Sequence, residues 1–426
     1  MNTQTERPEI LWLNVAFLTL TPLAALVVTP IYILEHGIRP SEVWACVGLW
    51  FLTGLGITAG YHRLFSHRSY KGSWPVRLFF AIIGAAACQN SIIAWCSDHR
   101  IHHKFVDTDR DPYDANRGFW YSHIGWIFIG GRRDPSYPNV PDLWADPICR
   151  FQHRFYWPIA IGFNVLIPLA LGIWTGRIGG MLLFAGLVRV VLVHHFTFTI
   201  NSLAHMWGRQ PWSKGNTARD NWFLSILSFG EGYHNYHHAY QYDYRNGPKW
   251  YNYDPSKWLI WSLSHMRLVW DLQRTPDEAL MRSRSKFEKE RLLTRLASRP
   301  GRSFEDWAAT FREGPSLLAQ RFKLLKDANH DQTRVSERIE LLRSYLVRRF
   351  EEAEGQLESA LLELKSRRTA LLAKRRRARK MPRSERTVAV KRDIEELSAA
   401  FREARRQARQ AFRRLLKTYA ICESGL

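Results

Sequence analysis

The stretch VWACVGLWFLTGLGITAGYHRLFSH (residues 43–67) joins a long apolar run to a pair of histidines. Residues 43–61 carry no charged side chain, and their length approaches the roughly 20 residues that a helix needs to cross a bilayer. His62 and His67 follow at once and flank Arg-Leu-Phe-Ser. The stretch therefore predicts a membrane span that places a pair of histidines at the membrane surface.

Two further histidine groups extend this pattern. His-Arg-Ile-His-His (residues 99–103) and Gly-Glu-Gly-Tyr-His-Asn-Tyr-His-His (residues 230–238) each carry three histidines spaced i, i+3, i+4. On a helix this spacing places the imidazoles on one face, where a metal ion can bind them. Together the three groups supply eight candidate ligands, which are His62, His67, His99, His102, His103, His234, His237 and His238.

The number of histidines bears on the metal. Neutral imidazole suits iron, zinc, copper and nickel, and eight ligands exceed the four that surround one tetrahedral zinc ion. The sequence therefore predicts two metal ions in a site dominated by histidine. Iron is favoured because its oxygen chemistry gives a reason to assemble so many ligands beside a bilayer, while zinc and copper stay open at this point.

Three more apolar runs are predicted to cross the membrane, at residues 10–34, 156–174 and 179–203. A further run, residues 78–96, is interrupted by Gln89, Asn90 and Ser91, and we expect it to lie in the interface or within protein. Four spans place all three histidine groups and both termini on one side. The arginine-rich loop on that side predicts that it is cytoplasmic. No removable signal peptide is expected.

The basic charge of the chain is concentrated at its end. The formal net charge is +22, and from Asp271 onward 38 Lys and Arg stand against 23 Asp and Glu, which accounts for +15. We therefore predict an all-α membrane protein with a membrane domain at residues 1–270 and a basic helical extension at residues 275–426. The five cysteines have no Cys-x-x-Cys spacing, so neither a disulfide framework nor a zinc ribbon is indicated.

Two heptad-like apolar stripes mark the extension, with Pro382 between them. They predict an antiparallel helical hairpin or coiled coil. The stripes consist of Ile339, Leu342, Leu346, Ala353, Leu357, Ala360, Leu364 and Leu371, and of Val390, Ile394, Leu397, Phe401, Ala404, Ala408, Leu415 and Tyr419. The basic run at residues 374–380 fits either anionic lipid headgroups or a solvated helix face; no nucleic acid partner is expected.

The three histidine groups, in this order and spacing, resemble those of the membrane fatty acyl desaturases of the stearoyl-type, delta-9 acyl-CoA desaturase family, in a bacterial-type form. Asp111-Pro112, Arg117-Gly118-Phe119, residues 122–126 (Ser-His-Ile-Gly-Trp) and residues 201–205 (Asn-Ser-Leu-Ala-His) match as well. The resemblance covers residues 10–270. It implies an oxygen-dependent oxidoreductase that introduces a cis double bond, most simply delta-9, into a long-chain saturated acyl group of fatty acid biosynthesis.

The resemblance also implies roles for single residues. Two iron ions would be held by the eight histidines above together with His205, with Asn201 holding a water at the metal and no catalytic residue beyond the metal centre. Gln89, Trp95 and Thr197 would line the bend of a tunnel that positions the acyl chain. Asn90 matches a contact to the head group, and Phe198 stands where animal members have tryptophan.

Some features leave alternatives open. Ser97 stands where members that use coenzyme A typically have arginine, so the carrier is coenzyme A, a phospholipid or an acyl carrier protein. No haem, iron–sulfur or flavin motif is found, which predicts an external electron donor of the ferredoxin or cytochrome b type. The rival functions are a membrane di-iron hydroxylase and, from another class, a non-catalytic metal-binding membrane scaffold. The expected location is a bacterial inner membrane.

Overall fold

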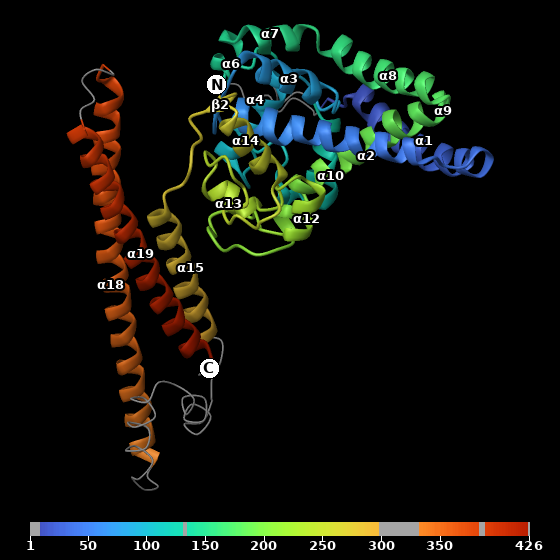
Figure 1. Cartoon of the computed structure of the whole chain (residues 1–426). Helices are drawn as coiled ribbons and strands as arrows, with labels where there is room; N and C mark the ends of the chain where they lie inside the picture. The colour runs from blue at the N-terminus through green and yellow to red at the C-terminus, as the bar shows by residue number, and fades with distance from the viewer. Residues whose placement is uncertain (1–8, 131–133, 298–331, 383–387, 425–426) are drawn as a thin grey trace, which may run out of the picture. The chain divides into compact units, whose positions relative to one another are not determined.

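The computed structural model of the chain describes residues 9–130, 134–297, 332–382 and 388–424. The chain divides into two compact units, Met1–Thr275 and Pro276–Leu426, which are described separately (Figure 1). Over its described residues the first unit is mainly helical, and in its two-stranded antiparallel sheet β1 (Lys71–Gly72) is hydrogen-bonded to β2 (Val269–Trp270). Its helices up to residue 154 are α1 (Trp12–His36), α2 (Pro40–Leu55), η1 (Gly56–Ser66), α3 (Trp74–Ala85), α4 (Ile92–Phe105), η2 (Ala115–Arg117), α5 (Phe119–His123), η3 (Gly125–Phe128), α6 (Pro141–Ala145) and α7 (Pro147–Arg154). The later ones are α8 (Tyr156–Thr175), α9 (Ile178–Met181), η4 (Leu182–Val188), α10 (Arg189–Asn201), α11 (Leu203–Met206), α12 (Trp222–Leu227), α13 (His234–Ala239) and α14 (Pro255–His265).

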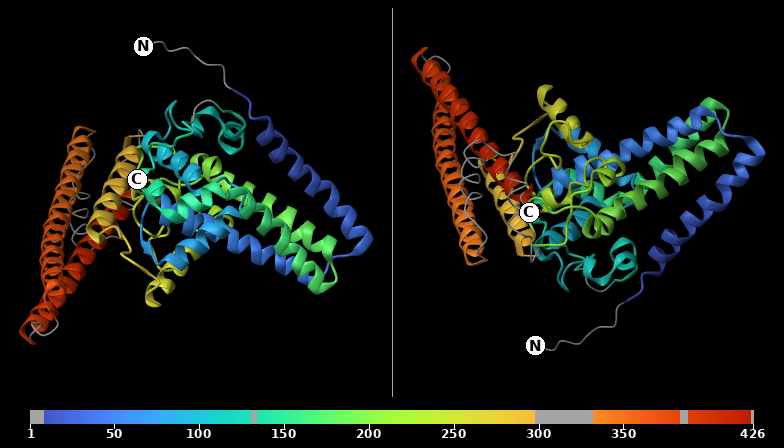
Figure 2. Two further views of the ribbon diagram at one scale, coloured as in Figure 1. Left: turned by 90° about the horizontal axis from the view of Figure 1, so that it is seen from above. Right: turned by 90° about the horizontal axis from the view of Figure 1, so that it is seen from below.

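Four helical stretches are long and apolar enough to cross a membrane, namely Trp12–His36, Pro40–Ser66, Tyr156–Thr175 and Ile178–Met206. The helices project from the rest of the unit; the last three stretches pack against one another, whereas α1 diverges from them toward its N-terminal end (Figures 1 and 2). Large apolar side chains on them stay exposed, such as Leu34 at 86% and Trp174 at 82%. Lipid would cover such a surface, since water would not favour it. The prediction of an all-α membrane protein with four spans is confirmed.

The second span differs from its prediction. It continues past residue 61 to Ser66, because α2 passes without a break into the π-helix η1, so His62 lies within the helical stretch and not after its end. Close packing accompanies this: a Cβ atom on Gly56 would lie 2.8 Å from the backbone nitrogen of Gly84 in α3. Glycine thus lets η1 approach α3 backbone to backbone. Single turns of π-helix are frequent at functional sites.

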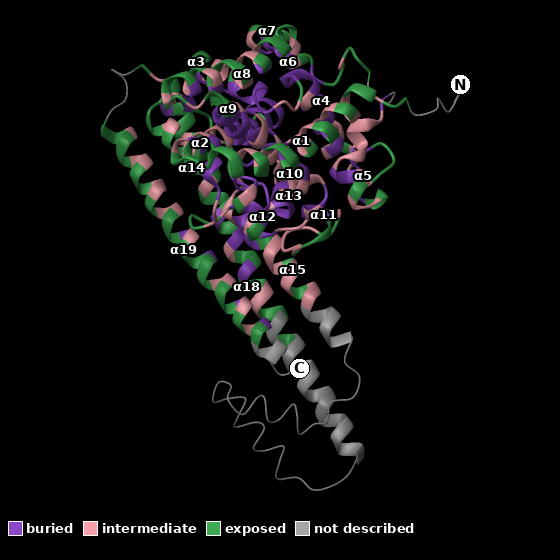
Figure 3. Ribbon diagram, turned by 90° about the vertical axis from the view of Figure 1, so that its right-hand side faces the viewer, coloured by how far each residue is buried: buried purple, intermediate pink, exposed green. Residues whose placement is uncertain are grey.

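The interrupted apolar run at residues 78–96 is not a span. It contributes α3, which has 12 residues, then a turn, and then the start of α4. A helix of that length falls short of the roughly 20 residues needed to cross a bilayer. Buried residues of unit 1 gather around α4, α10 and α13 (Figure 3), and the histidine groups lie on α4 and α13.

The second unit consists, over its described residues, of α15 (Asp277–Ala297), α18 (Gln332–Lys380) and α19 (Val388–Ser424). Lys374 pairs with Asp393 near the connection and Glu354 with Tyr419 at the far end, so α18 and α19 run antiparallel. The predicted helical hairpin is therefore present. The predicted stripes supply most of its core, namely Leu357, Leu364, Ala404, Ala408, Leu415 and Tyr419, whereas the side chains of Ile339, Leu342 and Leu346 lie outside the described residues. Met281 of α15 joins this core, which the stripes did not predict.

Candidate metal centre

The helical spacing of the histidines brings side chains from five segments together. His62 lies in η1, His67 directly follows it, and α4 and α13 carry one triplet each. His205 comes from α11 at the end of the fourth span. Residues that are far apart in the sequence thus meet in the interior of unit 1, where all but His103 and His238 are almost fully buried.

The nine histidines form two clusters, in each of which the potential ligand atoms lie within 4.8 Å of one another. Each cluster could hold a metal ion. The first histidine cluster contains His62, His67, His99, His103 and His237, and the second histidine cluster contains His102, His205, His234 and His238. The triplets do not each serve one ion, as a single helix face would suggest, because α4 and α13 both contribute to both clusters.

The spacing of the ring nitrogens tests whether metal ions fit. In the first cluster the Nε2 atoms of His62 and His237 lie 3.0 Å apart, and those of His67 and His99 lie 2.8 Å apart. In the second cluster the Nε2 atoms of His102 and His238 lie 3.2 Å apart. Two nitrogens about 2.1 Å from one ion are about 3.0 Å apart at a right angle and about 3.4 Å apart at the tetrahedral angle. The donor sets fit metal ions, and their spacing favours more than four ligands around each.

Electrostatics agree with this fit. Outside the membrane-spanning stretches, burial lowers the pKa of six cluster histidines well below the usual 6.5, and charge on neighbouring groups lowers it further. Neutral imidazole is the form that binds a metal ion. Lone pairs that face one another at this distance repel, and a cation between them removes the repulsion. The six are His67, His99, His103, His234, His237 and His238.

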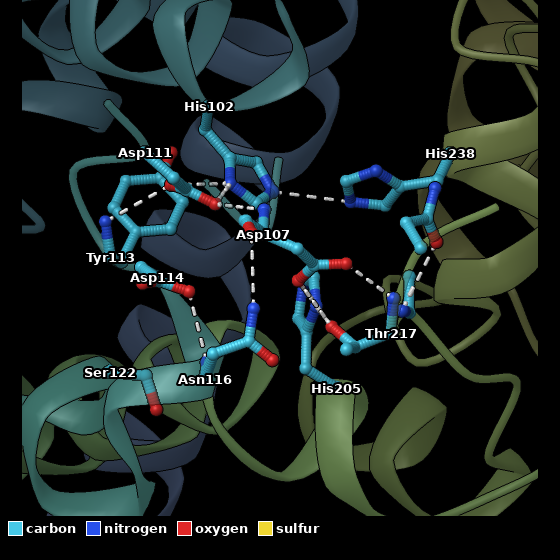
Figure 4. Close-up of polar contacts among 12 residues, drawn as sticks. His102, Asp107, Asp111, Tyr113, Asp114, Asn116, Ser122, His205, Thr217 and His238 are labelled. Atoms are coloured by element: carbon cyan, nitrogen blue, oxygen red, sulfur yellow. Dashed lines mark hydrogen bonds and ion pairs between the residues drawn. The ribbon is translucent and has the colours of Figure 1, made fainter. Parts of the chain in front are cut away.

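Carboxylates fix the orientation of two cluster histidines, His62 and His102, by contacting their Nδ1 atoms. Nδ1 of His62 lies 2.9 Å from Glu231, and Nδ1 of His102 lies 2.9 Å from both oxygens of Asp111 (Figure 4). An ionised carboxylate only accepts hydrogen bonds, so the proton belongs on Nδ1 and the lone pair on Nε2. Such partners orient metal-binding histidines in general. The adjacent Asp98 is also buried and lines the neighbouring cavity.

A relay through a threonine does the same for His205. Its Nδ1 lies 2.7 Å from the hydroxyl of Thr217, which donates to Asp107 at 2.6 Å (Figure 4). Since the hydroxyl proton goes to the carboxylate, the Thr217 oxygen accepts from Nδ1 of His205. Asp107 and Thr217 were not predicted from the sequence. Apart from their polarity, nothing in the sequence marks these two residues as partners of a histidine, because each lies in a loop without a recognisable spacing to the histidines.

A cavity of about 200 Å³ adjoins both clusters and is lined by His62, His99, His102 and His234. One water needs roughly 10–15 Å³, so the cavity has room for a larger ligand. Its wall includes every predicted substrate residue, namely Gln89, Asn90, Trp95, Thr197 and Phe198, and also Asn201. The assignment of these residues to substrate and of Asn201 to a metal-bound water stays a prediction.

Contacts in the cavity wall tie it to the first cluster. The Trp95 ring stacks on His99 with centroids 4.8 Å apart, and the Gln89 amide donates to the Thr197 hydroxyl at 3.0 Å. Ser97, by contrast, donates to Asn139 at 2.7 Å and does not line the cavity. In this part of the wall, side chains of α4, α10 and the turn before α4 are held by contacts with one another and with the first histidine cluster.

Three histidines outside the predicted groups also lie outside both clusters. His123 contacts Ser202 and His195 at 3.0 and 3.2 Å, and His194 contacts the carbonyl of Ala87 at 2.9 Å. They contribute to packing and hydrogen bonding within unit 1.

Four spans and two buried histidine clusters beside an apolar cavity define an integral membrane protein with a candidate dinuclear metal centre. The family model for fatty acid desaturases matches residues 42–272. The chain belongs to the fatty acid desaturase family, as the resemblance of its motifs predicts.

Relatives of known name include both acyl-CoA and acyl-lipid enzymes. The probable acyl-CoA desaturase of Schizosaccharomyces pombe is 42% identical over 62% of this chain and 58% of the relative, and acyl-CoA desaturase 1 of Saccharomyces cerevisiae is 47% identical over 53% and 45%. The sn-1 stearoyl-lipid 9-desaturase of Anabaena variabilis is 37% identical over 58% of this chain and 88% of the relative. The chain thus spans only about half the length of the two yeast relatives.

Proposed function

We propose that the chain is an oxygen-dependent fatty acyl desaturase that introduces a cis double bond, delta-9 by the names of its relatives, into a long-chain saturated acyl group. The observation that carries the proposal is the meeting of two histidine clusters at the wall of one cavity, within a chain of the fatty acid desaturase family. A scaffold without catalysis gives no reason for such a cavity beside the ligands.

The metal ions of the proposal are two irons, one in each histidine cluster. The spacing of the nitrogens near 3.0 Å and the five ligands of the first cluster support ions of higher coordination than structural zinc. When bound, iron would supply the oxygen and electron-transfer chemistry, with dioxygen as co-substrate and electrons from an external ferredoxin-like or cytochrome b type carrier. Asn201, on the cavity wall, would hold a water near the second cluster.

The protein's own contribution is to hold the acyl chain still. Trp95, Thr197 and Phe198 would pack against methylene groups, and the hydrogen bond from Gln89 to Thr197 would keep the wall from moving. Holding reacting atoms in place lowers the entropic part of the barrier. The carboxylate partners of His62 and His102 would meanwhile keep the Nε2 lone pairs directed at the metal sites.

The carrier of the acyl group is proposed to be coenzyme A or a membrane lipid. The yeast relatives are named for acyl-CoA and the Anabaena relative for an acyl lipid. Asn90 of the cavity wall would contact the head group, while Ser97, bonded to Asn139, is not free to do so. Supplying stearoyl-CoA or a stearoyl phospholipid to the purified protein with an electron donor distinguishes the two carriers.

We further propose that the histidine clusters and both termini face the cytoplasm of a bacterial inner membrane, and that the basic end of α18 contacts anionic lipid. Arg375, Arg376 and Arg377 are exposed there. Hydrogen exchange of the full chain in nanodiscs should show slower exchange over residues 374–380 when anionic lipid is present. The same rate with neutral and anionic lipid, or an equal effect on a chain with all three arginines changed to glutamine, would refute this lipid contact.

The test of the enzymatic function is fatty acid profiling of cells that express the chain, with double-bond positions mapped and an electron donor supplied. A cis monoene at the ninth carbon should appear with the unaltered chain and disappear with His102→Ala. His265→Ala, an exposed histidine on α14 outside both clusters, is the matched control and should keep the product. Hydroxylated product, or no new lipid from an iron-loaded chain, would overturn the proposal.

A further inference from the structure

The turn at residues 86–91, between α3 and α4, carries three cavity residues, Cys88, Gln89 and Asn90. Cys88 and Asn90 have φ angles of 53° and 83°, in the left-handed region that residues with a side chain adopt at a cost. Such conformations persist only where the surroundings determine them. The shape of this part of the cavity therefore depends on what holds the backbone of the turn.

Two polar side chains from membrane-spanning helices hold the start of the turn. Arg189 of α10 is fully buried and donates to the carbonyl of Ala86 at 2.9 Å and to the side-chain oxygen of Asn164 in α8. Asn164 itself donates to the same carbonyl at 3.1 Å. Ala86 is the residue at the C-terminal end of α3, where helix carbonyls lack partners and attract positive charge.

A third side chain holds the next two carbonyls. Nε2 of His194 lies 2.9 Å from the carbonyl of Ala87 and 3.1 Å from that of Cys88, so it donates to them, and its ring stacks on Phe198. We call Asn164, Arg189 and His194 the polar clamp. A buried guanidinium at membrane depth is costly, and lipid offers no water to satisfy the carbonyls in its place. Filling space alone would not require these three residues.

The polar clamp connects directly to the cavity. Arg189 and His194 lie on α10, which also places Thr197 and Phe198 in the cavity wall. At the other end of the turn, Gln89 donates to Thr197 at 3.0 Å. The polar clamp therefore fixes the start of the turn, and the hydrogen bond from Gln89 to Thr197 of α10 fixes its other end. Gln89 thus has one defined position relative to the histidine clusters.

We propose that the polar clamp is a positioning device for regiochemistry: by fixing the turn, it determines which carbon pair of the acyl chain lies beside the histidine clusters. This inference rests on the proposed desaturase function. A misplacement of about 1 Å can change a rate by about 100-fold, so a turn released by the loss of a clamp donor should admit the chain at more than one depth.

The test compares His194→Phe, which keeps a ring beside Phe198 but removes the donor, with His194→Gln, which keeps a donor. Thr175→Val, which removes a hydroxyl bonded to the Leu171 carbonyl at the far end of α8, is the control. Positional isomers are quantified together with iron content, and hydrogen exchange at residues 86–91 is measured on metal-free protein. Arg189→Met is the stronger variant; His194→Phe serves if that chain fails to accumulate.

We expect His194→Phe to bind iron normally, to exchange faster at residues 86–91, and to yield a second positional isomer at the expense of the first. His194→Gln and Thr175→Val should keep one isomer. A single unchanged isomer from His194→Phe, made by a chain that folds and binds iron, overturns the role of the clamp while the desaturase function stands. An unaltered chain that makes no unsaturated product overturns the proposed function and the clamp's role with it.

Discussion

Changing Glu231 to glutamine would test how the metal sites are held. The Glu231 carboxylate is 3% exposed and accepts from three donors: Nδ1 of His62 at 2.9 Å, Arg63 at 2.9 Å, and the Asn246 amide. Burial raises the pKa of Glu231, but the charge of Arg63 and the hydrogen bonds from His62 and Arg63 outweigh this and lower it overall, so the group is an anion. An amide of the same shape offers one acceptor oxygen and one donor nitrogen.

The amide cannot satisfy all three donors in either orientation. With its nitrogen toward Arg63, a guanidinium that is 1% exposed loses an ion pair, leaving only Asp254 as a charged partner among those described. With its nitrogen toward His62, the imidazole must move its proton to Nε2, which removes the lone pair from the first histidine cluster. Loss of such an outer partner typically lowers metal affinity by about 10–100-fold, and breaking a buried ion pair costs about 3–5 kcal/mol.

The assay is competition for iron against a chelator, followed by metal analysis and thermal unfolding of the detergent-purified chain. Glu231→Gln should lose one ion of the two at chelator concentrations about 10–100-fold lower than the unaltered chain. Asp111→Asn should lose the ion of the second histidine cluster, which contains His102. Asp271→Asn, at an exposed pair with Lys71, is the control. Equal iron affinity in Glu231→Gln and the control would refute the reasoning.

Two predictions concern other parts of the molecule. Leu364 is fully buried in the α18–α19 core, so Leu364→Ala should lower the free energy of opening of these helices, measured by hydrogen exchange, by about 2–5 kcal/mol. Leu362 is exposed, and Leu362→Ala should leave this free energy unchanged. Equal effects of the two changes would contradict the packing. Burial lowers the pKa of Lys257 from 10.5 to about 8. Between pH 8 and pH 10.5 the unfolded chain therefore binds more protons than the folded chain, and the free energy of unfolding should rise with pH by about 3 kcal/mol at most. Lys257→Met should lose this slope in thermal unfolding, and an unchanged slope would contradict it.

The sequence was most informative where periodicity and chemistry coincide. An apolar run long enough to cross a bilayer as a helix predicts a span independently of the rest of the chain. Histidines at i, i+3, i+4 predict a shared helix face. The spans were therefore placed within a few residues, except that η1 extends the second one to Ser66. The π-helix has no simple sequence signal, because it depends on packing of η1 against α3 through Gly56.

Partners from distant loops could not be read in the same way. Asp107 and Thr217 are 110 positions apart, and only the fold brings them to His205. The division of each triplet between two clusters was equally hidden, since it depends on how α4 and α13 face each other. In the tail, the apolar stripes predicted the pairing of α18 with α19. The helix α15 is highly charged and has no such stripe, and of its residues with described side chains only Met281 belongs to the buried core.

The helices α4 and α13 each carry histidines of both clusters. Since α4 gives His99 and His103 to the first cluster and His102 to the second, a movement of α4 would displace members of both clusters at once. The same holds for α13, whose position is tied to η1 because Glu231, three residues before it, is bonded to His62 and Arg63. The two clusters are therefore coupled through α4 and α13, and we predict that loading of one ion makes the other easier to bind, because the first ion would already fix both helices.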